Sequence, residues 1–116
     1  MKKNVMVIGS SSFSGSWMVK KLVEKNFKVI GVSRSKINKA YSFVNDKKFR
    51  FYKIDINKDF EKLKKIIKSS RPNIIINFAA QSYVRTSWNS PEDWMNTNIV
   101  SLIKIINFLK DKKYLK

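Results

Sequence analysis

The chain has 116 residues, of which 43% are hydrophobic, and this is enough for one domain with a buried core. It contains no cysteine and no histidine, which excludes disulfide frameworks, thiolate metal sites, zinc hydrolase mechanisms and serine–histidine mechanisms. The formal net charge of +17 suggests a nucleic-acid partner, but lysine greatly outnumbers arginine and is scattered over the expected solvent faces, so we interpret the charge as a solvated surface and expect no such partner.

The first predicted element is a strand at Asn4–Ile8, a short apolar run that follows two lysines. The run stops at Gly9, which makes it too short for a signal-peptide core or a membrane span. We therefore expect a cytoplasmic protein without a membrane partner. A helix follows at once, because Met18, Val19 and Leu22 recur at helical spacing.

The turn between this strand and this helix is a candidate phosphate-binding loop. Gly9 permits a tight turn, Gly15 lets the helix lie close to the strand, and Ser12 stands at the middle position of a G-x-x-G-x-x-G pattern. Backbone N–H groups at a helix start lack partners and attract a pyrophosphate. An ordinary strand-to-helix turn is the alternative. The candidate cofactor-binding residues here are Gly9, Ser11, Ser12, Phe13, Ser14 and Gly15.

Three further strands are predicted from β-branched and aromatic runs, at Lys28–Val32, Phe49–Ile54 and Asn73–Phe78. The stretch Lys36–Asp46 has a weaker pattern and predicts a short helix or a loop. The fourth strand contains three consecutive isoleucines, which is typical of a strand buried on both sides.

Two more helices are predicted in the second half of the chain. One lies between an Asn57 cap and Pro72, and its apolar positions are Phe60, Leu63, Ile66 and Ile67. The other opens with Ser90 as its N-cap, Pro91 at its first position and two acidic residues in its first turn. Its predicted apolar stripe consists of Met95, Ile99, Leu102, Ile103, Ile106 and Leu109.

Strands that alternate with helices predict an α/β fold, a doubly wound parallel sheet of Rossmann type with helices on both faces. The expected strand order is 3-2-1-4. The sheet is expected to be a partial Rossmann sheet, and together with the helices it makes three layers, α/β/α. Ligands of such sheets bind beyond the carboxyl ends of the strands, near the switch between the first and the fourth. Polar residues gather at that edge in this sequence.

Ser33 and Arg34 stand at the end of the second strand, where an acidic residue binds the adenosine ribose 2′-hydroxyl of a dinucleotide. Serine and arginine favour a 2′-phosphate instead, so we expect NADP rather than NAD. The alternative is that Arg34 is one more surface cation.

Asp55 and Asn98 each leave two interpretations open. Asp55 either caps the turn before Asn57 or accepts a hydrogen bond from adenine. Asn98 lies on the apolar face of the last helix, where a buried amide must find partners. It is either a satisfied core asparagine or the anchor of a polar network beneath the site.

The segment Asn77–Val84, followed by Ser87, Pro91 and Asn98, resembles the extended short-chain dehydrogenase/reductase family of NAD(P)-dependent epimerases and dehydratases. Within that family the GDP-mannose 4,6-dehydratase group is the most similar, because it shares the glycine spacing, an arginine after the second strand and an aspartate after the third. Two positions depart from its pattern: Ser12 replaces a glycine, and Tyr83 stands where histidine is common.

The resemblance covers the whole chain but only about the first third of such an enzyme. It implies that residues 1–116 are the N-terminal part of an NAD(P)-binding Rossmann domain, and that the rest of this domain and the substrate domain are absent. The further cofactor-binding residues it implies are Ile56, Phe78, Ala79, Ala80, Gln81 and Asn98, and the substrate-binding candidates are Ser82 and Arg85.

The activity that the resemblance implies is that of a nucleotide-sugar 4,6-dehydratase, a lyase, on a substrate such as GDP-mannose. The sugar would be oxidised at C4 by NADP⁺, lose water across C5 and C6, and recover the hydride at C6. The complete enzyme is expected to be a homo-oligomer. An epimerase of the same family and a non-catalytic nucleotide-sensing or interaction module are the alternatives.

Catalysis in this family depends on a Tyr-x-x-x-Lys pair, and no tyrosine of this sequence has a lysine four positions later. Asn45, Ile56 and Ser87 stand four positions after the first three tyrosines, and the sequence ends at Lys116, before the fourth position after Tyr114. We therefore expect no catalytic residue and no metal ligand in this chain, and we expect it to be inactive by itself. Residues 113–116 are expected to lead into a fifth strand.

Overall fold

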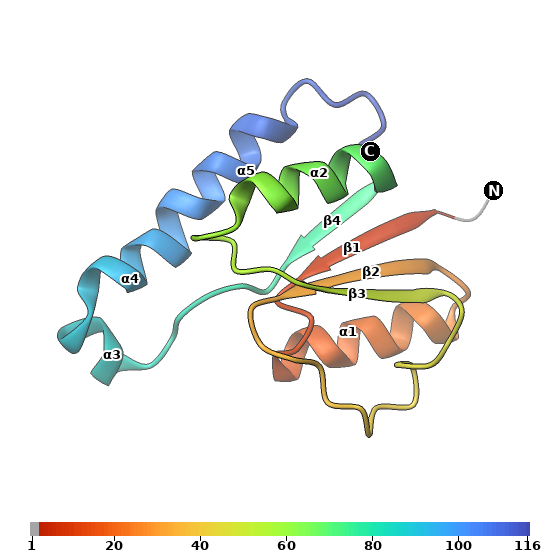
Figure 1. The fold of residues 1–116 in the computed structure, drawn as a ribbon, viewed down its shortest axis with the longest axis horizontal. Helices are drawn as coiled ribbons and strands as arrows, with labels where there is room; N and C mark the ends of the chain where they lie inside the picture. Colours follow the sequence, from red (N-terminus) through yellow and green to blue (C-terminus); the bar gives the residue numbers. More distant parts are fainter. Residues whose placement is uncertain (1–2) are drawn as a thin grey trace.

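The computed structural model describes residues 3–116 and contains one four-stranded parallel sheet in the order β3-β2-β1-β4 (Figure 1). The predicted fold class and strand order are confirmed. Val5 of the central strand pairs with Val29 on one side and with Ile74 on the other. The strands are β1 (Asn4–Ile8), β2 (Lys28–Ser33), β3 (Phe49–Lys53) and β4 (Ile74–Asn77), each within two residues of its predicted bounds.

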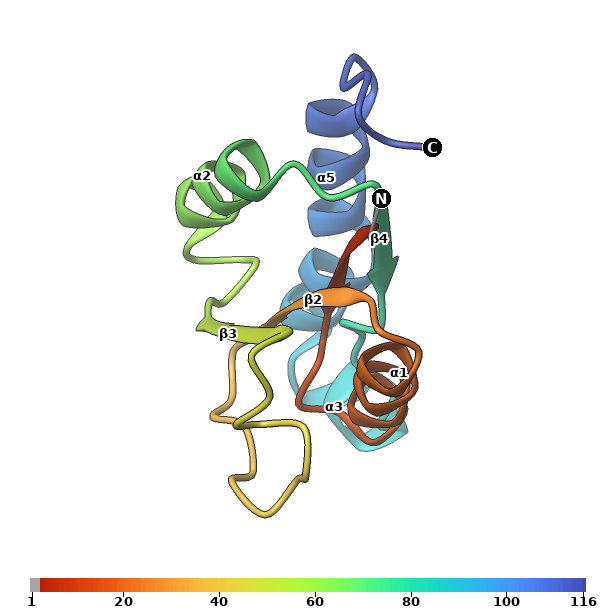
Figure 2. The ribbon, with the colours of Figure 1, turned by 90° about the vertical axis from the view of Figure 1, so that its right-hand side faces the viewer.

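Helices cover both faces of this sheet, which makes three layers (Figures 1 and 2). Helix α1 (Phe13–Glu24) covers one face, and helices α2 (Phe60–Ser70) and α5 (Ser101–Leu109) cover the other. Side chains alternate along β1 to serve both layers. Val5 and Val7 pack in the cluster that contains Val19 of α1, while Met6 and Ile8 pack in the cluster that contains Leu63 of α2.

The stretch Lys36–Asp46 is a loop of turns rather than a helix. Its one buried hydrophobic residue, Phe43, is 4% exposed and packs edge-to-face on Phe49, with 5.1 Å between ring centroids. This contact fixes the loop against the α1 side of the sheet.

The predicted cap of α2 is wrong, because Asp59 and not Asn57 stands at the N-cap. The Asp59 carboxylate accepts the N–H of Asp55 at 3.3 Å, and the Asn57 side chain turns to the last helical segment instead. The three isoleucines of β4 are half-buried and not enclosed, since β4 is an edge strand of this sheet.

The last helical region is interrupted, although the sequence predicts a single helix there. After an unpredicted short helix α3 (Val84–Asn89), the chain forms α4 (Pro91–Met95), a π-helical segment η1 (Asn96–Val100) and α5. The inward face carries Thr97, Ser101 and Ile105.

The predicted apolar stripe of this region is wrong as a buried face. Its members Met95, Ile99, Leu102, Ile103 and Ile106 are 38–59% exposed, and Leu109 alone packs against the core. The physical reason is that Asn57, on a neighbouring loop, donates to the Thr97 hydroxyl and accepts from the Ser101 hydroxyl, so the opposite, apolar side of the helix faces outward.

Candidate functional site

A cleft of about 220 Å³ lies at the carboxyl ends of the strands, where all four lead into loops. Eleven of the predicted cofactor-binding residues line it: Gly9, Ser11, Ser12, Ser33, Arg34, Asp55, Ile56, Phe78, Ala79, Ala80 and Gln81. The remaining ones, Phe13, Ser14, Gly15 and Asn98, lie next to these without lining the cleft. The sheet topology therefore gathers residues that are up to 72 positions apart, from Gly9 to Gln81.

The floor of the cleft depends on two glycines. Gly9 has φ +81°, and a Cβ atom there would lie 2.7 Å from the backbone N of Ala79. A Cβ atom on Gly15 would collide with the carbonyl oxygen of Gly9. Any side chain at either position would thus push the first turn of α1 away from β1 and β4.

Ser12 fills the middle position of the glycine pattern and caps α1. Its Oγ accepts the N–H of Gly15 at 3.0 Å and donates to the carbonyl oxygen of Gly9 at 2.7 Å. The N–H groups of Phe13 and Ser14 find no acceptor among residues 3–116. Two free backbone donors at the start of a 12-residue helix, with its dipole behind them, suit an anionic group.

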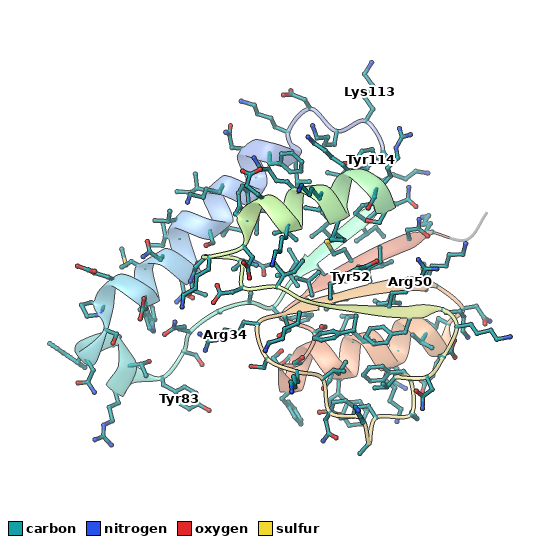
Figure 3. The ribbon with its side chains drawn as sticks, viewed as in Figure 1. Arg34, Arg50, Tyr52, Tyr83, Lys113 and Tyr114 are labelled. Atoms are coloured by element: carbon teal, nitrogen blue, oxygen red, sulfur yellow. The ribbon has the colours of Figure 1, made fainter. Side chains whose placement is uncertain are left out.

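Arg34 and its neighbours form one rim of the cleft. The Ser11 hydroxyl donates to the carbonyl oxygen of Ser35 at 3.2 Å, which ties the loop after β2 to the glycine–serine turn. Arg34 is exposed, and within residues 3–116 its guanidinium makes no ion pair. Figure 3 shows Arg34 near the carboxyl ends of the strands. The segment after β4 leaves the sheet at the same end and runs toward Tyr83.

Asp55 follows β3, the strand that pairs with β2, so it lies in the loop next to that of Arg34. One of its carboxylate oxygens accepts the N–H groups of Asn57 at 2.9 Å and Lys58 at 3.3 Å, so the capping interpretation describes its protein contacts. The side chain also lines the cleft. Capping and a contact to a ligand are therefore compatible at this residue.

Asn98 is hydrogen-bonded to Gln81, which lines the cleft after β4. Its Oδ1 accepts the N–H of Gln81 at 2.8 Å, and its Nδ2 donates to the carbonyl oxygen of Gln81 at 2.8 Å. Both ends of the Asn98 amide are thus satisfied by the loop after β4.

Five lining residues are not among the predicted site residues: Ile8, Ser35, Ile54, Asn57 and Thr97. All five are direct chain neighbours of predicted residues, so wider windows at the strand ends would include Ile8, Ser35, Ile54 and Asn57. The sequence pattern indicates only a helix cap at Asn57. Thr97 carries no signal except its position beside Asn98, because its inward orientation depends on the π-helical segment.

Ser82 and Arg85, the substrate-binding candidates, are exposed and lie outside the cleft, on the linker and in α3. Among residues 3–116, no group of three or more acidic side chains is arranged to hold a metal ion. In the same part of the chain, every helix is too short or too polar to span a membrane.

Comparison with known proteins relates this chain to a protein family. The chain matches the family model described as GDP-mannose 4,6 dehydratase over residues 6–116. Protein CapI of Staphylococcus aureus is 30% identical over 111 residues, which cover 88% of this chain and 32% of CapI. The chain thus spans about a third of the length of this curated relative.

Solved structures show the same arrangement. UDP-glucose 4-epimerase of Thermotoga maritima, solved with UDP-glucose, is 27% identical and superimposes with a TM-score of 0.79, over 95% of this chain and 35% of the epimerase. dTDP-glucose 4,6-dehydratase of Bacillus anthracis, solved in complex with NAD, has a TM-score of 0.80 at 22% identity, over 98% of this chain and 36% of the dehydratase. The second likeness concerns the fold alone.

Proposed function

Because the chain belongs to the GDP-mannose 4,6 dehydratase family, we propose that it forms the NADP-binding part of a nucleotide-sugar 4,6-dehydratase. In this proposal residues 1–116 are the N-terminal part of an NAD(P)-binding Rossmann domain. The substrate of the whole protein is a nucleotide sugar of the GDP-mannose type.

The observation that carries the proposal is the cleft itself. It combines a glycine floor that excludes side chains, two free N–H donors at the start of α1, and an unpaired guanidinium on the rim among the described residues. A pyrophosphate fits the helix start, and an adenosine fits between the loops after β2 and β3. These features suit a dinucleotide better than a single small anion, because they lie along the whole strand-end edge.

Arg34 supports NADP over NAD. A guanidinium binds a 2′-phosphate through charge-assisted hydrogen bonds, whereas a ribose 2′-hydroxyl calls for an acidic acceptor. In this chain Ser33 and Arg34 stand at that position, and Asp55, after the neighbouring strand β3, is engaged with backbone donors. Neutralisation of the phosphate by Arg34 is the basis for the proposed preference.

The bound nicotinamide supplies a hydride acceptor and donor. This chain's own residues bind and orient the dinucleotide: the α1 start holds phosphate, Arg34 holds the 2′-phosphate, and Gln81, held by Asn98, forms the wall nearest the linker to α3. Ser82 and Arg85 follow that wall and begin the proposed nucleotide-sugar side. Proton transfer at the sugar is assigned to a Tyr-x-x-x-Lys pair that this sequence does not contain.

A nucleotide-sugar 4-epimerase is the second candidate, favoured by the 27% identity to the T. maritima epimerase. Both activities use the same kind of cofactor cleft, so the residues described here serve either one. A nucleotide-sensing module on this fold is the third candidate. We also propose a cytoplasmic location and, for the whole protein, a homo-oligomer joined through the exposed apolar residues of η1 and α5.

The proposal is tested by titrating the purified 116-residue chain with NADPH and with NADH and following the fluorescence of the nicotinamide. We expect saturable binding of NADPH that 2′,5′-ADP displaces better than 5′-AMP does. We also expect no turnover of GDP-mannose or UDP-glucose with NADP⁺, since the catalytic pair is missing. Binding of neither dinucleotide at millimolar concentration would contradict the cofactor role, and turnover would contradict the assignment of catalysis to another part of the protein.

A further inference from the structure

Three polar side chains meet at one wall of the cleft, from segments that are far apart in the sequence. Asn57, in the loop between β3 and α2, donates through Nδ2 to Thr97 Oγ1 at 2.9 Å. Ser101 Oγ donates to Asn57 Oδ1. Both ends of the Asn57 amide are therefore bonded to the last helical region. We call Asn57, Thr97 and Ser101 the polar lock.

The lock coincides with the π-helical segment η1. The N–H of Ser101 donates to the carbonyl oxygen of Asn96, five residues earlier, instead of to Thr97. π-helical turns are rare and often occur at functional sites. Here the turn joins Thr97, which is 9% exposed, to Ser101, which is 3% exposed, while the apolar Ile99 and Val100 between them face outward.

The polar lock lies in an otherwise apolar interface between the last helical region and the loop after β3. One turn beyond Ser101, Ile105 packs into an apolar cluster with Ile56 and Leu63. Polar side chains buried beside such a cluster lower stability unless they are paired, so apolar residues would hold the helix against the loop just as well. The polar groups lie only at the end that lines the cleft, where Asn57 and Thr97 contribute to its wall.

The lock joins two loops whose strands are not hydrogen-bonded to each other in the sheet. In the order β3-β2-β1-β4, the strands β3 and β4 occupy opposite edges, and two strands separate them. The loop after β3 carries Asn57, and the loop after β4 carries Gln81, whose Nε2 lies 3.4 Å from Thr97 Oγ1 as a donor. Thr97 thus accepts from both loops, and the distance between them depends on this hydroxyl.

Resting on the proposed cofactor role, we propose that the polar lock is a positioning device that sets the width of the dinucleotide cleft between the loops after β3 and β4. Asn57 and Thr97 act as positioning residues and Ser101 orients the Asn57 amide. The lock holds Asp55 and Ile56 on one side and Gln81 on the other at the separation that a bound dinucleotide needs. Removing one bond leaves the apolar interface around Ile105 intact and widens the cleft.

The test measures the Kd for NADPH of four variants of the full chain. Thr97→Val keeps the shape and removes the hydroxyl, Thr97→Ser keeps the hydroxyl, and Asn57→Leu keeps the size and removes the amide without adding a charge to the cleft wall. Thr86→Val is the matched control, since Thr86 is exposed in α3 and its hydroxyl bonds only locally, to the carbonyl oxygen of Tyr83.

We expect Thr97→Val and Asn57→Leu each to raise the Kd about three- to tenfold, as the loss of partly buried hydrogen bonds implies. Thr97→Ser and Thr86→Val should stay near the wild-type Kd, and the Asn57→Leu/Thr97→Val double variant should lose no more than the weaker-binding single variant. Rescue by serine separates positioning from a packing role, because serine lacks the methyl group but keeps the acceptor.

Unchanged NADPH binding in Thr97→Val and Asn57→Leu, with a wild type that binds, overturns the lock alone. Equal weakening in Thr97→Ser and Thr97→Val also overturns it, because the methyl group rather than the hydroxyl would then matter. A wild type that binds neither NADPH nor NADH overturns the proposed function and the lock's role with it. Circular dichroism melting of each variant identifies one that fails to fold, and the result then comes from the other lock position.

Discussion

Asn98 binds the backbone of Gln81 through both atoms of its amide, with N···O distances of 2.8 Å for each hydrogen bond. The two residues are 17 positions apart, and the pair of bonds copies the exchange that two strand residues make across a sheet. The Asn98 side chain of η1 thus bonds the loop after β4 in the way that a neighbouring strand would. A side chain that satisfies a backbone in this way cannot be replaced by another without leaving a donor or an acceptor unpaired.

The Asn98–Gln81 pair predicts a specific order of stabilities. Asn98→Asp keeps the acceptor but places a carboxylate oxygen against the carbonyl oxygen of Gln81, so we expect a loss of about 1–3 kcal/mol in the free energy of unfolding. Urea denaturation followed by circular dichroism measures it. Asn107→Asp, at an exposed position of α5, is the control for the added charge. Equal stability of the two variants would contradict this role of Asn98.

Arg34 should determine the cofactor preference. Arg34→Ala removes a charge-assisted contact worth roughly 1.5–3 kcal/mol, which corresponds to about ten- to a hundredfold weaker NADPH binding. Binding of NADH should change little, because NADH has no 2′-phosphate. Parallel fluorescence titrations measure both, with Lys36→Ala as the control for a nearby exposed cation outside the cleft. Tighter binding of NADH than NADPH by the wild type would rule out this role of Arg34.

Gly15 should tolerate no side chain. The Cβ atom of alanine would collide with the carbonyl oxygen of Gly9, and backbone atoms of a tight turn have little room to yield. We expect Gly15→Ala to lower the free energy of unfolding by about 1–3 kcal/mol or more and to abolish dinucleotide binding. Ser14→Ala, one position earlier on the exposed side of α1, keeps the backbone N–H that the proposed site uses and should have a melting temperature close to that of the wild type. Thermal melting and NADPH titration test both, and a wild-type melting temperature for Gly15→Ala would count against the close approach.

The positive charge should bind duplex DNA only weakly and without sequence preference. Lysine, asparagine and isoleucine are all abundant, as an A+T-rich coding sequence produces, and the lysines recur along the whole sequence. Contacts of this kind are screened at about 150 mM salt, where the Debye length is roughly 8 Å. A mobility-shift series from low to physiological salt measures it. Submicromolar binding that persists at the higher salt would restore a nucleic-acid partner.

The outward apolar residues of η1 and α5 should make the chain self-associate. Ile103 and Ile106 are 59% and 57% exposed, and contiguous apolar surface of this kind commonly marks an interaction site. We expect the chain to elute larger than a monomer, and Ile103→Glu or Ile106→Glu to shift it toward the monomer. Asn107→Glu adds the same charge to an exposed polar position of α5 and is the control. A monomeric wild type across the accessible concentrations would contradict the prediction.

The sequence by itself determined the fold and most of the cleft. Apolar, β-branched and aromatic runs placed the four strands, and the structure shows that Val5 and Val7 pack in one cluster and Met6 and Ile8 in the other. Parallel strands bring their carboxyl ends to one edge, so the strand positions alone predict that the residues after each strand lie together. Local rules were sufficient here, since each strand end needs only its own few residues to be recognised.

The tertiary structure alone decided the last helical region and the residues joined to it. The spacing of Met95, Ile99 and Ile103 indicated a core face, yet those residues are exposed. Thr97 and Ser101 turn inward because Asn57, 40 and 44 residues away, supplies partners for their hydroxyl groups. Helical periodicity shows which residues share a face of a helix, but which face is buried depends on the atoms that the rest of the fold places opposite it.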